Sequence, residues 1–163
     1  MSRSHRALFL LTLLLSVSLA TTANAAGQPF DPCSLLTPAE IQAVVGKPVK
    51  AGVAKVQANP ASGAGCTYVI GDFGSLNVLV KPLQSYETPA IIQAQFAKMN
   101  MKPAVLPQVG DAAFFTSPGF EMVQLHAFKS GKYILITMLV PGLKEPAVRP
   151  LAAKLVKTLL PRL

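Results

Sequence analysis

Two cysteines constrain this chain more than any other feature. Cys33 stands just before a strong helix start, and Cys66 opens the run Cys66-Thr67-Tyr68-Val69-Ile70, whose β-branched and aromatic residues predict a strand. The first 25 residues indicate export, and two cysteines in an exported chain most simply pair with each other. Redox or metal chemistry would need a C-x-x-C spacing or further ligands, and the sequence has neither. We therefore predict one structural disulfide, Cys33–Cys66.

The residues after Cys33 predict a short helix with clear ends. Thr37 followed by Pro38 is typical of an N-cap with proline at the first helical position. Glu40, three residues after Thr37, completes a capping box. Gly46 is a natural residue to end the helix. The first disulfide cysteine is thus expected to be tied to the start of a well-marked helix.

The first 25 residues are typical of a secretory signal peptide. Arg3 and Arg6 precede the apolar run 7–20, and Ala23-Asn24-Ala25 matches a small-x-small cleavage site. A retained N-terminal anchor is the alternative. Lipid attachment is disfavoured, because Cys33 follows Phe30-Asp31-Pro32 rather than small residues. We expect an exported protein, periplasmic or secreted, with no transmembrane segment after cleavage.

The mature chain, residues 26–163, is long enough for a single α+β domain with one core. Without Arg3 and Arg6 it keeps 13 basic and 7 acidic residues, a net charge of +6. A basic surface favours anionic lipid, cell-wall polymer or an acidic protein as a partner. Nucleic acid is not expected, since the lysines are scattered and no binding motif is present.

The pattern along the chain predicts three helices and six strands. The helices are expected from Pro38 to Gly46, from Thr88-Pro89 to near Asn100, and from Glu145 to Pro161. The strands are expected at 49–56, 66–70, 75–81, 111–116, 121–128 and 132–140. Tight turns between strands favour an antiparallel sheet.

We therefore predict an α+β fold with an antiparallel sheet of about five to six strands and helices packed on one face, in the order α-βββ-α-βββ-α. The stretch 37–43 resembles 88–94 in sequence, which suggests a duplicated αβββ unit.

Catalytic residues are not evident in this sequence. His126 is the single histidine of the mature chain, and strand alternation places it with Gln124 on a face that we expect to be half-exposed. One histidine without nearby carboxylates or thiols cannot form the usual zinc site. No serine lies in a G-x-S-x-G elbow. We predict no catalytic residue, no metal and no cofactor.

Methionine and phenylalanine residues offer a candidate binding groove for a small apolar ligand. Methionine adapts to irregular apolar ligands, and such residues between helices and sheet are typical of a groove. The alternative is that they form ordinary core. The candidate residues are Phe96, Met99, Phe114, Met122, Phe128 and Met138.

Three other segments are weaker candidates for contact with a partner. The C-terminal basic amphipathic helix is suited to an anionic membrane surface, although its apolar stripe fits equally well on the sheet. The loops 59–65 and 117–120 are candidates because loops on a rigid frame often carry function.

The run Asp31-Pro32-Cys33-Ser34-Leu35-Leu36-Thr37, Gly46 and Cys66-Thr67-Tyr68 together resemble a family of small secreted bacterial proteins of unknown function. Its members are frequently lipid-anchored and share a D-P-C-x-L-L-T…G…C-x-[WY] arrangement. Val109-Gly110-Asp111-Ala112-Ala113 is similar to that family's second short block. The resemblance implies that the two cysteines pair, and it supplies no activity. This chain lacks the lipid-attachment cysteine of many members.

The leading functional hypothesis is an exported, non-catalytic binding or interaction domain. It would present loops or an apolar groove to an envelope component, another protein or a small apolar ligand. An inhibitor of a secreted hydrolase, with a disulfide-held loop in a foreign active site, is the alternative. An enzyme of unknown type is the third hypothesis.

Overall fold

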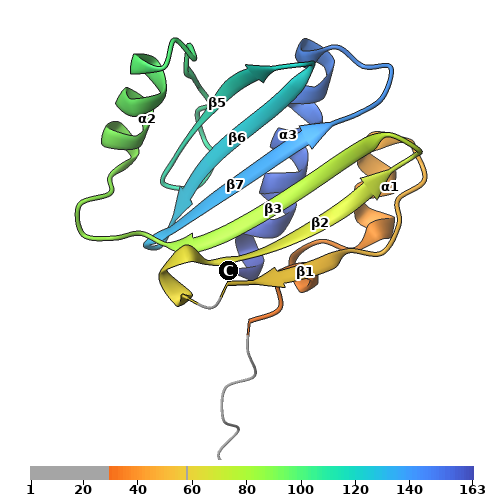
Figure 1. Ribbon diagram of the computed structural model, residues 1–163, viewed down its shortest axis with the longest axis horizontal. Coiled ribbons are helices and arrows are strands. Elements are labelled where there is room, and N and C mark those ends of the chain that lie inside the picture. The colour runs from red at the N-terminus through yellow and green to blue at the C-terminus, as the bar shows by residue number, and fades with distance from the viewer. Residues whose placement is uncertain (1–29, 58) are drawn as a thin grey trace, which may run out of the picture.

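A seven-stranded antiparallel sheet forms the frame of the molecule (Figure 1). This computed structural model describes residues 30–57 and 59–163, so the expected signal peptide lies outside the described residues and stays a prediction. The strands are β1 Val53–Val56, β2 Ala64–Ile70, β3 Gly74–Pro82, β4 Ala104–Val105, β5 Ala112–Gly119, β6 Met122–Lys129 and β7 Lys132–Leu139. Across the sheet they follow the order β1-β2-β3-β7-β6-β5-β4.

Three α-helices accompany the sheet: α1 Pro38–Val45, α2 Pro89–Lys98 and α3 Glu145–Leu159. Short 3₁₀ helices lie at Pro32–Leu35, Pro60–Ser62 and Leu160–Arg162. The prediction of an α+β fold with an antiparallel sheet is confirmed. In the described part of the chain, no helix is both long enough and apolar enough to cross a bilayer.

The signals that predicted α1 are present in the structure. The side chain of Thr37 accepts a hydrogen bond from the backbone N–H of Glu40, and the Glu40 carboxylate accepts one from the N–H of Thr37. Gly46 ends the helix in the left-handed conformation, with φ of 68°, where a side chain would cost energy. The predicted capping box and helix end are both confirmed.

The strand count was predicted too low, because β4 has only two residues and carries no periodic signal. It pairs with the middle of β5, Ala104 lying opposite Phe115. The predicted strand 49–56 is also shorter than expected. Only Val53–Val56 form β1, while Val49 makes an isolated bridge to Ile70.

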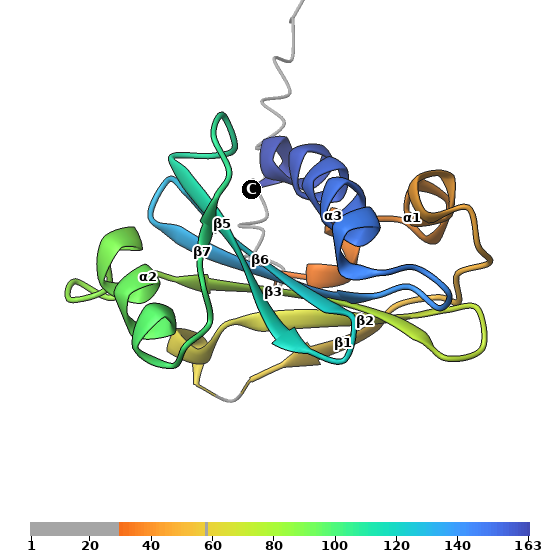
Figure 2. The ribbon, with the colours of Figure 1, turned by 90° about the horizontal axis from the view of Figure 1, so that it is seen from above.

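The helices do not share one face of the sheet, so that prediction was wrong. In β5 and β6 the side chains alternate between two apolar clusters, Phe115 and Leu125 belonging to one and Phe114 and Phe128 to the other. The larger cluster packs against α1 and α3, which contact each other. The smaller cluster lies on the opposite face and includes Ile92 of α2. Figure 2 shows α2 well away from the α1–α3 pair.

The arrangement of strands is compatible with the suggested repeat, whereas the helices depart from it. β1-β2-β3 and β5-β6-β7 each form a meander, and the two meet antiparallel at β3 and β7. A two-fold axis perpendicular to the sheet, between β3 and β7, would exchange the two meanders. It would leave the two faces of the sheet on their own sides. This rotation could not superpose α1 on α2, because the two helices lie on opposite faces of the sheet. Duplication therefore stays a prediction.

Candidate functional site

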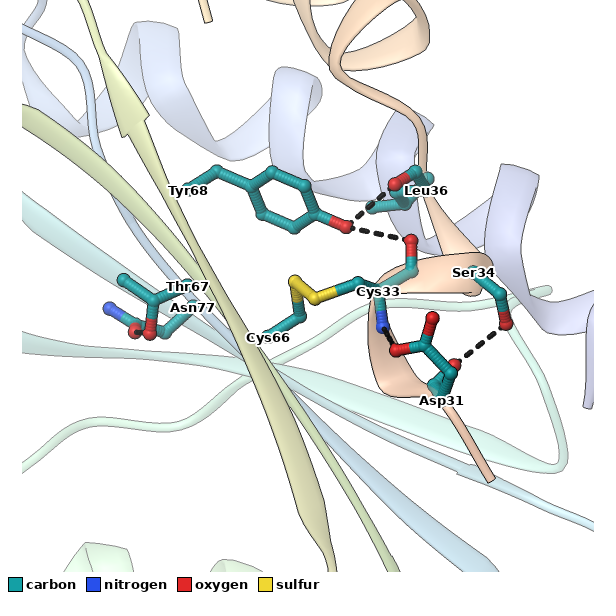
Figure 3. The surroundings of a disulfide bond; sticks show 8 residues. All are labelled: Asp31, Cys33, Ser34, Leu36, Cys66, Thr67, Tyr68 and Asn77. Atoms are coloured by element: carbon teal, nitrogen blue, oxygen red, sulfur yellow. Dashed lines mark hydrogen bonds between the residues drawn. A yellow bond between two sulfur atoms is a disulfide. The ribbon is translucent and has the colours of Figure 1, made fainter. Parts of the chain in front are cut away.

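The disulfide between Cys33 and Cys66 ties the N-terminal segment to β2 (Figure 3). The hydroxyl of Tyr68 donates to the carbonyl of Leu36 at 2.6 Å and also reaches that of Cys33 at 3.2 Å. Burial raises the pKa of Tyr68 to about 12, so the phenol keeps its proton. Gly52 lies so close that a Cβ there would be 2.4 Å from the Cys66 sulfur. This is a packed structural anchor.

The C-terminal end of the chain is fastened to the same anchor. Arg162 donates to the carbonyl of Leu35 at 2.8 Å and forms a two-point ion pair with the carboxylate of Glu40. Hydrogen bonds from Arg162 and from the backbone of Thr37 lower the pKa of Glu40 to about 2. The carboxylate that caps α1 therefore also joins the two ends of the described chain.

The six predicted groove residues do not line a common groove. Phe96 of α2 meets Phe114, and Phe128 lies beside Phe114, all in the smaller apolar cluster. Met138 is fully buried in the larger cluster on the opposite face. Met99, at the end of α2, is 55% exposed. The sixth residue, Met122, is the first residue of β6.

His126 is fully buried, so the expectation of a half-exposed histidine was wrong. The cause is α2, which covers this face of the sheet. The ring of Phe96 lies 4.5 Å from the imidazole, centroid to centroid, and the ring of Phe114 stacks at 4.6 Å. Burial lowers the pKa of His126 to about 4, and the imidazole is therefore neutral at pH 7.

Four side chains form a hydrogen-bonded chain through this cluster. His126 Nδ1 lies 2.7 Å from the hydroxyl of Tyr133, and Nε2 lies 2.8 Å from that of Thr116. Thr116 donates to Gln124 at 3.2 Å. This bond uses the only hydroxyl proton of Thr116, so Nε2–H donates to Thr116 and Nδ1 accepts from Tyr133. One neutral tautomer satisfies every group.

The chain of side chains has the properties of a structural network. Among the residues that the structure describes, no carboxylate is bonded to the imidazole, and the ring is closed off from solvent. Within residues 30–57 and 59–163, no group of three or more His, Cys, Asp or Glu side chains could hold a metal ion. Satisfied networks of this kind fix a unique packing arrangement.

A candidate site is an apolar hollow of about 490 Å³ at the end of the sheet where β3 finishes and β7 begins. Its size is within the range usual for small-molecule sites. The apolar part of its wall comes from Phe30, Pro60, Ala64, Val80 and Pro82. We define these residues, together with Lys81 and Lys132, as the β3-end hollow.

The two lysines at the β3-end hollow differ in position: Lys132 lies on the face of the sheet that carries Val80, whereas the ammonium group of Lys81 lies on the opposite face, over Tyr133. Lys81 Nζ forms an ion pair with Glu87 at 2.5 Å and lies 5.6 Å from the centroid of the Tyr133 ring. Lys132 Nζ donates to the carbonyl of Leu163 at 2.5 Å. A backbone hydrogen bond from Gln84 and the bond from Lys81 lower the pKa of Glu87. The ammonium group of Lys81 is thus already paired with a carboxylate, and Lys132 is the lysine suited to the acidic head of an amphipathic molecule in the hollow.

The sequence did not predict that these residues form the β3-end hollow. The loop 59–65, a weaker sequence candidate for contact with a partner, supplies Pro60 and Ala64 to the hollow. Phe30, Val80 and Lys132 come from separate segments that meet only in the fold. A lysine at a strand end is common on any sheet, so no local signal could have singled them out.

Comparison with protein-family models, with curated proteins and with solved structures finds no match in any of the three.

Proposed function

We propose that this protein is an exported, non-catalytic binding domain that takes a small amphipathic acid into the β3-end hollow. The ligand has an apolar body and an anionic head group such as a carboxylate. The single observation that carries the proposal is an apolar hollow of about 490 Å³ with the ammonium group of Lys132 at its rim.

The wall of the hollow supports binding of the apolar body. Val80 and Ala64 belong to adjacent paired strands, where they lie directly opposite each other. β2 is also tied to the N-terminal segment by the disulfide, which limits how far this wall can move. A preformed wall lowers the loss of conformational entropy on binding.

The rim supports binding of an anionic head. An ammonium group has three N–H donors, and among the described residues Lys132 uses one of them, on the backbone oxygen of Leu163, so donors remain for a carboxylate. Lys81 makes no direct contact, since its ammonium group is paired with Glu87 on the opposite face of the sheet. We therefore assign the direct contact to Lys132.

Calorimetric titration with dodecanoate, kept below its micelle concentration, tests the proposal. We expect saturable binding with one molecule per chain, and weaker binding of dodecanol, which lacks the charge. Lys132→Gln should weaken dodecanoate binding about tenfold, because a charged hydrogen bond is lost. Dodecanol binding should change little in this variant.

Lys144→Gln is the matched control, since Lys144 lies in the turn before α3 at the other end of β7. It removes the same charge from the chain and should leave dodecanoate affinity unchanged. Equal loss in both variants would mean that only net charge matters, and the proposed site would be wrong. Absence of binding by both ligands would also overturn the proposal.

A further inference from the structure

Helix α2 is held on the sheet by fewer buried side chains than α3. Ile92 is its one buried residue, whereas α3 has five. Among the described residues, no hydrogen bond or ion pair joins Pro89–Lys98 to a strand. The disulfide does not fasten this helix either, because it belongs to the larger apolar cluster on the opposite face. Apolar packing therefore holds α2 in place.

The surface beneath α2 contains the imidazole of His126. The ring of Phe96, on α2, lies 4.5 Å from the imidazole, centroid to centroid. Ile92, also on α2, packs in the same cluster as Phe114 and Phe128 of the sheet. Movement of this helix away from the sheet would therefore admit water to the imidazole and expose aromatic rings.

No charged side chain touches the imidazole in the part of the chain that the structure describes. Its two nitrogens are bonded to Thr116 and Tyr133, and burial raises the pKa of Tyr133, so this phenol is neutral. The one ionisable side chain of α2 is Lys98, which is exposed and has the same charge as a protonated imidazole. Lys132, which begins β7, lies on the opposite face of the sheet.

The carboxylates on the elements around His126 are bound to other groups. Glu87, before α2, is paired at 2.5 Å with Lys81, whose Nζ lies over the ring of Tyr133. The other two precede β5 and β6 at exposed positions and have cations of their own, Asp111 with Lys129 and Glu121 with Lys144. A proton on the covered imidazole would therefore place a buried charge without a counter-ion.

Acid opposes the docking of α2. Tyr133 donates to Nδ1 of His126, and a proton on Nδ1 removes this acceptor. An imidazole open to water has the ordinary pKa of 6.5, whereas burial lowers the pKa of the covered imidazole to about 4. The open arrangement thus binds the proton more tightly. Docking is fully favourable above pH 6.5 and weakens as the pH falls towards 4.

We propose that α2 is an acid-released cover, which leaves β5, β6 and β7 when His126 takes up a proton and exposes the aromatic rings of the smaller apolar cluster. The sheet, the disulfide and the larger cluster stay folded, because they do not depend on α2. Loss of the proton allows α2 to dock again. This device is separate from the β3-end hollow and does not rest on ligand binding there.

Amide hydrogen exchange of the disulfide-bonded protein, followed by NMR at pH 7 and pH 5, tests the proposal. Protection factors, which correct for the intrinsic effect of pH on exchange, are compared between α2 and β3. We expect α2 amides to be less protected than β3 amides at both pH values. The protection of α2 should fall about twentyfold from pH 7 to pH 5, the ratio that follows from pKa values of 6.5 and about 4.

Variants at His126 test whether this residue is the sensor. His126→Gln cannot take up the proton, so the protection of α2 should change by less than about twofold between the two pH values. His126→Phe keeps a ring in the cluster and serves as the second variant if the glutamine variant does not fold. Glu87→Gln is the control, because it removes the carboxylate before α2 and should keep the twentyfold fall.

Equal protection of α2 and β3 would mean that α2 leaves the sheet only when the whole fold is lost, and would overturn the proposal. Unchanged protection of α2 from pH 7 to pH 5, or the same fall in a folded His126 variant as in the parent protein, would overturn it too. Loss of the fall in Glu87→Gln would assign the response to that carboxylate instead of His126.

Discussion

At the scale of single residues, Tyr68 joins the N-terminal anchor to the sheet. We predict that Tyr68→Phe lowers the free energy of unfolding by about 1–2 kcal/mol, because the buried carbonyl of Leu36 loses its donor. Urea unfolding measures the change. Tyr86→Phe, at an exposed tyrosine, is the control and should change stability by less than about 0.5 kcal/mol. Equal effects would contradict a special role for the Tyr68 hydroxyl.

His126 makes the stability of the fold depend on pH. Burial lowers its pKa from 6.5 to about 4, so the unfolded chain binds a proton at a higher pH than the folded chain does. The stabilisation from the neutral imidazole is therefore complete above pH 6.5 and is lost as the pH falls towards 4. We expect a loss of about 2 kcal/mol between pH 7 and pH 5 from urea unfolding at each pH.

The variant His126→Gln separates this effect from other titrating groups. It should be less stable at pH 7, because the ring packing and a bond in the side-chain network are lost, but its stability should be nearly flat between pH 7 and pH 5. Glu40 does not interfere, since its pKa is lowered from 4.5 to about 2 and its contribution is lost only below pH 4.5. A variant as pH-dependent as the parent protein would contradict the assignment.

Several residue roles follow from the sequence, whereas the environment of His126 does not. Thr37, Glu40 and Gly46 act over a few residues, and local spacing was enough to predict them. Strand alternation also placed His126 correctly on the face of Gln124. Alternation says nothing about what covers a face, and the burial of His126 depends on α2.

At the scale of elements, the disulfide connects the Pro32–Leu35 3₁₀ helix to β2 across 33 residues. Replacing either Cys33 or Cys66 by serine should lower the free energy of unfolding by about 4 kcal/mol, because the unfolded chain regains the entropy of an open loop. The double variant should cost little more than either single one, since one bond is lost in all three. Additive losses in thermal unfolding would contradict a single shared bond.

The docking of α2 controls the surroundings of His126. We predict that Phe96→Ala raises the pKa of His126 towards 6.5, because removing the ring that lies 4.5 Å away admits water to the imidazole. An NMR titration of the His126 ring protons measures this pKa. Met99→Ala is the control on the same helix, at an exposed side chain, and should leave it near 4. An unchanged pKa in Phe96→Ala would show that α2 is not the cover.

The sequence predicts most element positions and fails on the face that α2 takes. Strands 66–70, 75–81, 121–128 and 132–140 each correspond to one strand of the sheet. In α2 the apolar residues do not form a single stripe, because Ile92 is buried while Ile91 is half-exposed. When a helix has apolar residues on two sides, its sequence does not show which face of the sheet it covers.

At the scale of the whole molecule, two hollows lie at opposite ends of the sheet. The β3-end hollow lies where β3 ends at Pro82, and the hollow lined by Phe73 and Phe120 lies where β3 begins at Gly74. The antiparallel pairing of β2, β3 and β7 fixes their separation.

The candidate site was beyond sequence reasoning for a physical reason. The β3-end hollow gathers Phe30, Pro60, Val80 and Lys132 from four segments, and each of these residues is ordinary in its local context. Only the strand order β2-β3-β7 brings them together, and this order places the last strand of the chain beside the third. The fold also separates the residues of the predicted groove, since Met138 lies on the opposite face from Phe114.

The most direct measurement is the position of bound dodecanoate, determined by NMR from nuclear Overhauser contacts between ligand and protein. We predict contacts from the acyl chain to the side chains of Ala64 and Val80, and a shift of the Lys132 ammonium signal on binding. Contacts at Phe73 and Phe120 instead, or no contacts with a saturated ligand, would contradict the account that the β3-end hollow is the binding site.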